Sequence, residues 1–296
     1  MTSEVEHYPV LHREIVDTFK DIDGNIIVDA TVGGAGHSYL LLKNFPEKKI
    51  IGIDKDEYAL KRAKERLKDF EGRYTLVKSS YKDIDEILDK LGFDKAHGFL
   101  FDLGVSMFQL KNQRGFSFQR DDFLDMRMDK DQKLTAYDVV NTYPEHMLEN
   151  IIKKYGEERF SKRIAKSIVE HRKKRPIQTT KDLENIIFHA YPRKARYGRI
   201  HPATRTFQAI RIEVNNELEE LELALKKAIE RLDKGGRIAV ISFHSLEDRI
   251  AKNLFKEYGK LKKIKNLTKK PIVPKEDEIK ENPPSRSAKL RIAERI

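Results

Sequence analysis

Apolar and polar positions follow a regular order along the first hundred residues. Short apolar runs at 26–29, 49–54, 74–78 and 97–102 each end in, or lead into, polar residues. Such runs are typical of buried strands, and the amphipathic segments between them are typical of helices. This order predicts a β-α-β-α-β-α-β unit, which is a parallel sheet with helices on both faces.

The pattern changes near residue 109. Between 109 and 206 we find no strand-like alternation, and helices are expected at 136–142, 144–155, 159–175 and 179–191. The first pattern then resumes with a helix at 216–232, a strand at 237–242, a helix at 245–258 and a final antiparallel edge strand at 288–296. The sequence therefore predicts a discontinuous α/β domain, 1–108 and 207–296, with an inserted helical domain, 109–206.

Polar residues stand where the first four strands end. Asp29, Asp54 and Asp102 are the last residues of three of these runs. Tyr81 comes shortly after the run at 74–78. The carboxyl ends of parallel strands meet at one edge of a sheet, where ligands of doubly wound folds collect. A carboxylate at the end of the second strand, here Asp54, accepts hydrogen bonds from the ribose hydroxyls of a nucleoside.

A glycine-rich turn follows the first strand in the stretch IIVDATVGGAGH, residues 26–37. Glycine adopts positive φ and lets a ligand approach the backbone, and the N–H groups of a helix start favour anionic or polar groups. The dinucleotide fingerprint is incomplete, because Tyr39 stands where its third glycine belongs. The looser Asp-x-x-x-Gly-Gly-x-Gly form resembles the first motif of class I S-adenosylmethionine (SAM) methyltransferases.

Composition excludes several classes of site. The 296 residues include no cysteine, which removes disulfides, thiolate nucleophiles and Cys-ligated zinc. C5 methylation of pyrimidines, which commonly needs a cysteine nucleophile, is therefore disfavoured. We see no metal-ligand spacing, no membrane-spanning run and no secretory signal. We thus expect a cytoplasmic protein with no metal and no membrane partner.

Positive charge is concentrated in one part of the chain. Residues 153–211 contain 17 Lys and Arg against five Asp and Glu, a net charge of +12. The whole chain carries +11, so the remainder has a net charge of −1. A local positive field of this kind favours a polyanionic partner, most simply nucleic acid, whose phosphates the inserted domain would hold.

Long and unusual stretches spread over the whole chain resemble one family. They are ATVGGAGHS at 30–38, DLGVS at 102–106, RGFSF at 114–118, DMRMD at 125–129, YGEERF at 155–160, HPATRTFQAIR at 201–211, SFHSLEDR at 242–249 and RSAKLRIAER at 286–295. The resemblance is to the RsmH (MraW) family of cytosine-N4 methyltransferases of 16S ribosomal RNA. It implies a class I, Rossmann-like SAM-methyltransferase fold, with 16S rRNA or the small ribosomal subunit as partner and one cytidine of the decoding region as substrate.

The resemblance also implies where SAM binds. The positions that match the family's cofactor site are Ala35, Gly36, His37, Asp54 at the ribose, Tyr81 by the adenine, and Asp102 and Gln109 near the methionine or adenine side. The chain departs from the family pattern in two places. Ala35 replaces a more usual glycine, at some cost in backbone freedom, and Met107 and Lys111 break the pattern around Gln109.

Methylation of an exocyclic amine needs in-line attack by a nitrogen whose lone pair is delocalised into the base. A site assists by accepting hydrogen bonds from the amino hydrogens and by positioning the base. Asp102 is the first candidate for this role, and Ser242 and His244 at the end of the fifth strand are the next. His244 has an alternative interpretation as a structural residue that closes its turn.

Two other functions remain open at this point. One is a SAM-dependent amino-methyltransferase that acts on another nucleic acid. The other is a non-catalytic RNA-binding protein whose sheet no longer binds SAM, and titration with SAM separates it from the enzymes.

Overall fold

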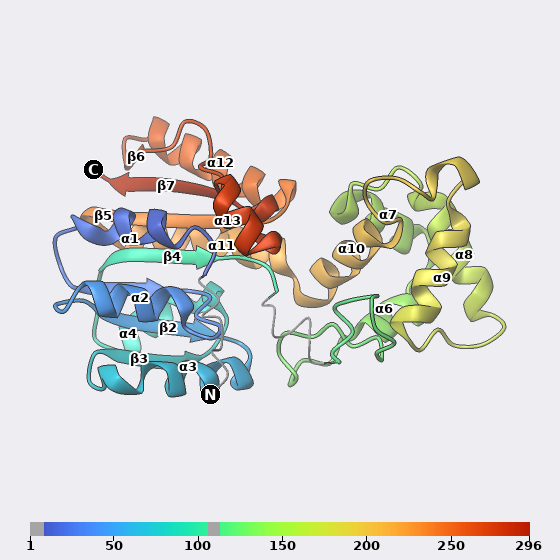
Figure 1. Ribbon diagram of the computed structural model, residues 1–296, viewed down its shortest axis with the longest axis horizontal. Helices are drawn as coiled ribbons and strands as arrows, with labels where there is room; N and C mark the ends of the chain where they lie inside the picture. The colour runs from blue at the N-terminus through green and yellow to red at the C-terminus, as the bar shows by residue number, and fades with distance from the viewer. Residues whose placement is uncertain (1–8, 106–112) are drawn as a thin grey trace. The chain divides into compact units, whose positions relative to one another are not determined.

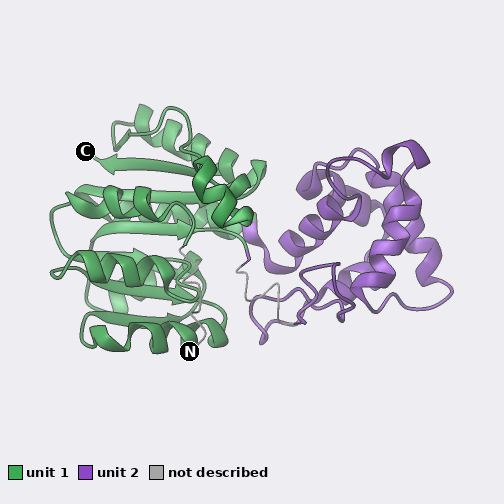
Figure 2. Ribbon diagram, in the orientation of Figure 1, with its two compact units in different colours: residues 1–104, 218–296 green, residues 105–217 purple. Residues whose placement is uncertain are grey.

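The chain folds into two compact units (Figure 2). The computed structural model describes residues 9–105 and 113–296. The sheet unit comprises 1–104 and 218–296, and the helical unit comprises 105–217. The boundary expected after residue 206 falls inside helix α10 (Ala203–Asn215), all of which belongs to the helical unit. No helix among the described residues is long and apolar enough to span a bilayer.

The described part of the sheet unit forms a seven-stranded sheet in the order β3-β2-β1-β4-β5-β7-β6 (Figure 1). Its strands are β1 (Ile26–Asp29), β2 (Lys49–Asp54), β3 (Tyr74–Lys78), β4 (Ala96–Asp102), β5 (Leu232–Ser242), β6 (Ile264–Asn266) and β7 (Lys289–Arg295). The first five strands pair in parallel, and β7 runs antiparallel to both β5 and β6. The predicted doubly wound α/β architecture is thereby confirmed.

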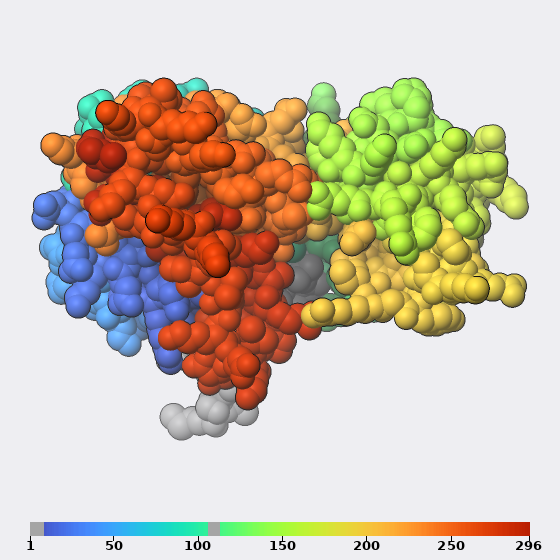
Figure 3. Space-filling model, turned by 90° about the horizontal axis from the view of Figure 1, so that it is seen from above, coloured from blue at the N-terminus to red at the C-terminus, as the bar shows by residue number. Residues whose placement is uncertain are grey.

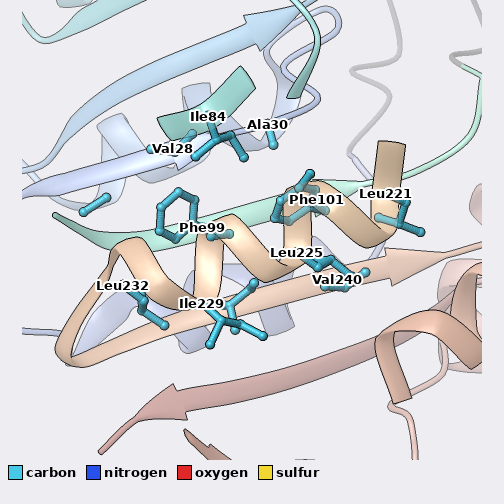
Figure 4. Close-up of a cluster of buried hydrophobic side chains, with 14 of the residues drawn as sticks. Val28, Ala30, Ile84, Phe99, Phe101, Leu221, Leu225, Ile229, Leu232 and Val240 are labelled. Atoms are coloured by element: carbon cyan, nitrogen blue, oxygen red, sulfur yellow. The ribbon is translucent and has the colours of Figure 1, made fainter. Parts of the chain in front are cut away.

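Helices cover both faces of this sheet. They are α1 (His12–Lys20), α2 (Gly36–Asn44), α3 (Glu57–Leu67), α4 (Ile84–Lys90), α11 (Glu217–Arg231), α12 (Ser245–Lys260) and α13 (Glu276–Glu281). Successive strand side chains point to opposite faces. Val28 belongs to a hydrophobic cluster with residues of α4, α11 and α12, part of which Figure 4 shows, whereas Ile27 belongs to a second cluster with residues of α1, α2 and α3.

The expected edge strand at the C-terminus is not at the edge. Strand β7 lies between β5 and β6, and Lys265 of β6 pairs with Glu294 of β7. The three-residue β6 comes from a lysine-rich segment in which we expected no strand, because Ile264 is its one buried residue. Short, lysine-rich strands are typical of sheet edges, where they discourage pairing with another chain.

Helices α1 and α13, which are far apart in the sequence, meet on one face of the sheet unit. The backbone N–H of Leu11 donates to Glu278 Oε1 at 2.6 Å, and Arg13 lies 3.8 Å from Asp277. In Figure 3, blue residues from the start of the described chain lie beside orange-red residues from the region of α13. Helix α13 therefore fastens α1, which leads directly into the first strand.

The helical unit has a hydrophobic core of its own. Its helices are α6 (Ala136–Thr142), α7 (Glu145–Gly156), α8 (Ser161–Arg172), α9 (Thr180–Ala190) and α10. The first four lie where the sequence predicts helices, but α10 was not expected. It buries Ala203, Phe207, Ile210 and Val214 at helical spacing. It also packs closely on α7, because a Cβ on Gly156 would lie 2.7 Å from the carbonyl oxygen of Arg205.

Candidate active site

The predicted site residues of the sheet unit meet at one edge of the sheet. In the register of the parallel strands, Asp29 is opposite Leu100 and Asp102 is opposite Ile241. Consequently β1, β4 and β5 end side by side, with β2 beyond β1. This edge is the one at which doubly wound sheets bind their ligands.

Asp54 holds the glycine-rich turn. Its Oδ2 accepts a hydrogen bond from the backbone N–H of Gly33 at 2.9 Å, and its Oδ1 accepts one from Asp56 at 2.8 Å. Burial raises the pKa of Asp54 to about 6, although both hydrogen bonds lower it. The carboxylate therefore connects the end of β2 to the loop after β1, and so places the turn beside the second strand.

The turn uses a left-handed residue that is not glycine. Ala35 has φ 58° and precedes the first residue of α2, Gly36. This conformation costs an L-residue roughly 1–2 kcal/mol, which agrees with the cost expected for alanine at this position. A Cβ on Gly34 would meet nothing within 4 Å, whereas one on Gly36 would lie 3.3 Å from Pro9. The loop is thus open at Gly34 and closely packed at Gly36.

Asp29 has a structural role beneath the turn. Its Oδ2 accepts from the Ser38 hydroxyl at 2.6 Å, and its Oδ1 accepts from the N–H of Thr31 at 3.3 Å. The side chain is buried, and burial raises its pKa to about 6. Asp29 therefore joins the end of β1 to the first turn of α2.

His37 lies between the turn and Asp102. Its Nε2 is 2.8 Å from the carbonyl oxygen of Val10, and its Nδ1 is 3.5 Å from Asp102 Oδ2. Burial lowers the pKa of His37, so the ring is neutral at pH 7. Because a carbonyl can only accept, Nε2 carries the proton, and Nδ1 turns its lone pair toward Asp102.

Asp102 has a buried oxygen at this edge that is available to a ligand. Its backbone N–H donates to Thr31 Oγ1 at 2.7 Å, but its buried Oδ1 has no hydrogen-bond partner among the described residues. Burial raises the pKa of Asp102 to about 7, and the negative charge of Glu247 adds to the effect. An unpartnered buried acceptor is unfavourable in a folded chain, and it fits a site completed by a ligand that donates hydrogen bonds.

The titration of Asp102 predicts how stability varies with pH. The folded pKa lies above the unfolded value of 3.8, so the wild type loses stability as pH rises from about 4 through about 7. We expect Asp102→Asn to remove this loss, and the variant's advantage to grow to about 1–3 kcal/mol and level off above pH 7. Urea unfolding at pH 4, 5 and 8 measures it. A stability advantage of Asp102→Asn that stays constant over this pH range would contradict a raised pKa for Asp102.

A cluster around Glu220 supports Tyr81. The buried Glu220 carboxylate accepts from the Ser80 hydroxyl at 2.9 Å and from Lys82 Nζ at 3.3 Å, and it also pairs with Lys55. Lys55 Nζ lies 6.0 Å from the ring centre of Tyr81, which meets Phe101 edge to face. We did not single out Glu220 from the sequence, because it stands on α11, 140 residues from Ser80.

Ser242 and His244 have structural partners at the end of β5. Ser242 is buried, and its hydroxyl donates to the carbonyl oxygen of Lys289 at 3.3 Å. His244 is the N-cap of α12, where its Nδ1 accepts from the N–H of Glu247 at 3.4 Å. Glu247 Oε2 in turn accepts from the backbone N–H of His244 at 3.3 Å, and it also accepts from that of Phe243 at 2.8 Å. This reciprocal cap shows that His244 closes its turn, and the spacing of His244 and Glu247 is the signal that could have identified Glu247.

One predicted cofactor residue lies outside the described residues. Gln109, together with Met107 and Lys111, falls between residues 105 and 113. The other proposed cofactor positions line the same edge of the sheet. Backbone N–H groups at a helix start, carboxylates at two strand ends and an aromatic ring after a third are suited to a nucleoside-containing ligand.

The chain is similar to known proteins over its whole length. The model of the MraW methylase family matches residues 4–296. Proteins named ribosomal RNA small subunit methyltransferase H, from Sulfurihydrogenibium sp. strain YO3AOP1 and Persephonella marina, are each 64% identical over 292 residues, which are 99% of this chain and 100% of theirs. A protein of the same name from Caldicellulosiruptor saccharolyticus is 50% identical over 308 residues, covering 98% of this chain and 99% of its own.

Proposed function

Since the chain belongs to the MraW methylase family, we propose that it uses SAM to methylate N4 of one cytidine in the decoding region of 16S rRNA. The observation that carries the proposal is the similarity to rRNA small subunit methyltransferases over the full length of both chains. The chain is a SAM-dependent methyltransferase of the class I fold. The polar edge of its sheet supports the same conclusion.

We assign the cofactor to that edge. SAM supplies a methyl group on a sulfonium, which the amine attacks in line. Asp54 would hold the ribose, Tyr81 would lie by the adenine, and the start of α2, with Ala35, Gly36 and His37, would face the cofactor. Gln109 would complete the site. The open side of the turn at Gly34 and the anchored ring of Tyr81 support this placement.

Asp102 would act on the amine. Its unpartnered Oδ1 can accept a hydrogen bond from the cytosine amino group, and this bond raises the electron density on N4 during attack. The ionised form is the stronger acceptor, so its pKa of about 7 places the active form at neutral to alkaline pH. Ser242 and His244 stay candidates, but their structural hydrogen bonds favour a role in shaping the end of β5.

The helical unit would hold the RNA. Helix α8 exposes Lys162, Arg163 and Lys166, and the residues after it expose Lys173 and Lys174. Cations of this kind bind phosphates of any sequence and steer a polyanion to the protein. The partner would be 16S rRNA or the small ribosomal subunit, and the enzyme would act in the cytoplasm, where that substrate is found.

Methyl transfer tests the proposal directly. Small subunits from a strain without the enzyme are incubated with labelled SAM, and their nucleosides are analysed by mass spectrometry. We expect N4-methylcytidine in the 16S rRNA. Methylation at another atom, or transfer only to a different nucleic acid, would identify another amino-methyltransferase, and failure to bind SAM would leave a non-catalytic RNA-binding protein.

The assignment of Asp54 to the ribose has a matched control. We expect Asp54→Ala to weaken SAM binding by about 10- to 100-fold, because it removes both the acceptor and the support of Gly33. Asp56→Ala removes the N-cap of α3, where Asp56 accepts from Tyr58, and should cost only about 1 kcal/mol of stability. Isothermal titration with SAM compares the two variants. Equal loss of affinity in both would contradict a direct contact by Asp54.

A further inference from the structure

The loop between α9 and α10, residues 191–202, exposes an aromatic ring among cations. Tyr197 is 86% exposed. Arg193, Lys194 and Arg199 are also exposed, and none of the three has an acidic partner within 4.0 Å among the described residues. An exposed aromatic ring and cations without acidic partners, in one short loop, are suited to a ligand that offers both a flat face and negative charge.

The loop is anchored beneath Tyr197. The Arg196 side chain donates from Nε to the carbonyl oxygen of Tyr191 at 3.1 Å and from Nη2 to that of His189 at 3.0 Å. Its guanidinium lies 5.4 Å from the ring centre of Phe188, and the Tyr197 ring meets Phe188 edge to face at 5.9 Å. Tyr197 is therefore exposed on a fixed support.

The far end of the loop is held as well. His201 stacks on Phe118, with 4.7 Å between ring centres and an angle of 25°, and its Nε2 lies 3.3 Å from Glu184. Phe118 in turn meets Phe207 of α10. Because both ends are tied to helices, little conformational entropy is lost when a ligand stacks on the exposed ring.

We propose that Tyr197 stacks on an unpaired base of single-stranded RNA while Arg193, Lys194 and Arg199 bind the flanking phosphates. This inference rests on the proposed function, in which RNA is the substrate. A base stacks on an aromatic ring whatever its identity, and guanidinium groups match phosphate oxygens. A duplex hides the faces of its bases, so the loop would distinguish single strands from duplexes, whereas α8 carries cations but no Phe, Tyr or Trp.

Two variants of one residue separate stacking from charge. The full-length protein, Tyr197→Ala and Tyr197→Phe are titrated into a fluorescein-labelled oligocytidylate of about 12 nucleotides and into an RNA duplex of similar length. We expect Tyr197→Ala to weaken binding to the single strand by about 5- to 100-fold, with duplex binding unchanged. Tyr197→Phe keeps the ring and should bind as the wild type does.

The cations give a second readout. Arg199→Ala should weaken binding to both probes and reduce the salt dependence, log Kd against log salt, by about 0.7 for the single strand. Tyr197→Ala should leave that slope unchanged. Lys173→Ala, after α8, is the matched control, since it removes an exposed cation outside the loop and should lower the slope without changing the preference for single strands.

The outcomes distinguish this inference from the proposed function. Single-strand binding by Tyr197→Ala that equals the wild type, or an equal loss on both probes, would overturn stacking, as would a wild type that does not bind the single strand. A wild type that binds the single strand through Tyr197 but transfers no methyl group to small subunits would keep the inference and overturn the proposed function. If the wild type transfers methyl groups to small subunits but Tyr197→Ala binds the single strand as the wild type does, the proposed function is kept and the inference is overturned.

Discussion

Asp102→Ala is expected to lower kcat for methyl transfer by a factor of about 10²–10³, with the fold intact. The reason is that Asp102 Oδ1 is buried and has no hydrogen-bond partner among residues 9–105 and 113–296, and is therefore available to accept from the amine at the moment of attack. Asp102→Asn keeps the shape but places a donor beside the amino group, so it should be equally impaired. Single-turnover transfer from labelled SAM to small subunits measures both variants.

The pH profile gives the same prediction a second test. With a pKa of about 7, Asp102 should make the wild-type rate rise through neutral pH, and that step should disappear from the residual activity of Asp102→Asn. Asp94→Ala serves as the control, because Asp94 is 86% exposed and should change neither rate nor profile. If Asp102→Ala instead loses SAM affinity while kcat is kept, Asp102 contacts the cofactor and not the amine.

Arg291→Ala is expected to lower the free energy of unfolding by about 3–5 kcal/mol. Arg291 on β7 is 5% exposed, and its Nε and Nη2 donate to the two carboxylate oxygens of Asp248 on α12 at 2.7 and 3.2 Å. Removing the guanidinium leaves a carboxylate that is only 14% exposed without its principal partner. Lys289 remains 4.0 Å from Asp248, which places the expected cost toward the lower end of the range.

Urea unfolding followed by circular dichroism measures this loss. Arg13→Ala is the matched control, because the Arg13–Asp277 pair is 3.8 Å long and both side chains are more than half exposed, so its removal should cost less than about 1 kcal/mol. The double variant Asp248→Asn with Arg291→Met should recover part of the loss, since it leaves no buried charge. Equal destabilisation by Arg291→Ala and Arg13→Ala would show that the buried pair contributes no more to stability than the exposed pair.

The Asp248–Arg291 pair also joins two stretches that are far apart in the sequence. The segments at 242–249 and 286–295 both resembled the family, but nothing in their sequences indicates that they touch. In the structure the antiparallel pairing of β5 and β7 brings them together, with Ser242 opposite Lys289. A motif identified from sequence can therefore mark a structural contact as readily as a catalytic group.

Most strands and helices along the chain, the interruption by a helical unit and the edge where the polar residues gather are predictable from the sequence alone. These follow from local periodicity, because a strand or helix that buries one face must repeat apolar residues at a fixed spacing. The same pattern located Asp54 and Asp102 at strand ends. The resemblance of long motifs then gave the family.

Contacts between residues far apart in the chain became visible only in the folded protein. The structure shows that Glu220 binds the residues on either side of Tyr81, that β6 lies outside β7, and that α10 belongs to the helical unit. The structure also distinguishes Asp29, whose carboxylate accepts from Ser38 and Thr31, from Asp102, whose Oδ1 has no hydrogen-bond partner in the part of the chain that the structure describes. The sequence shows two similar acids at strand ends, but hydrogen bonding and burial are set by neighbours that only folding brings together, and these neighbours leave no periodic signal.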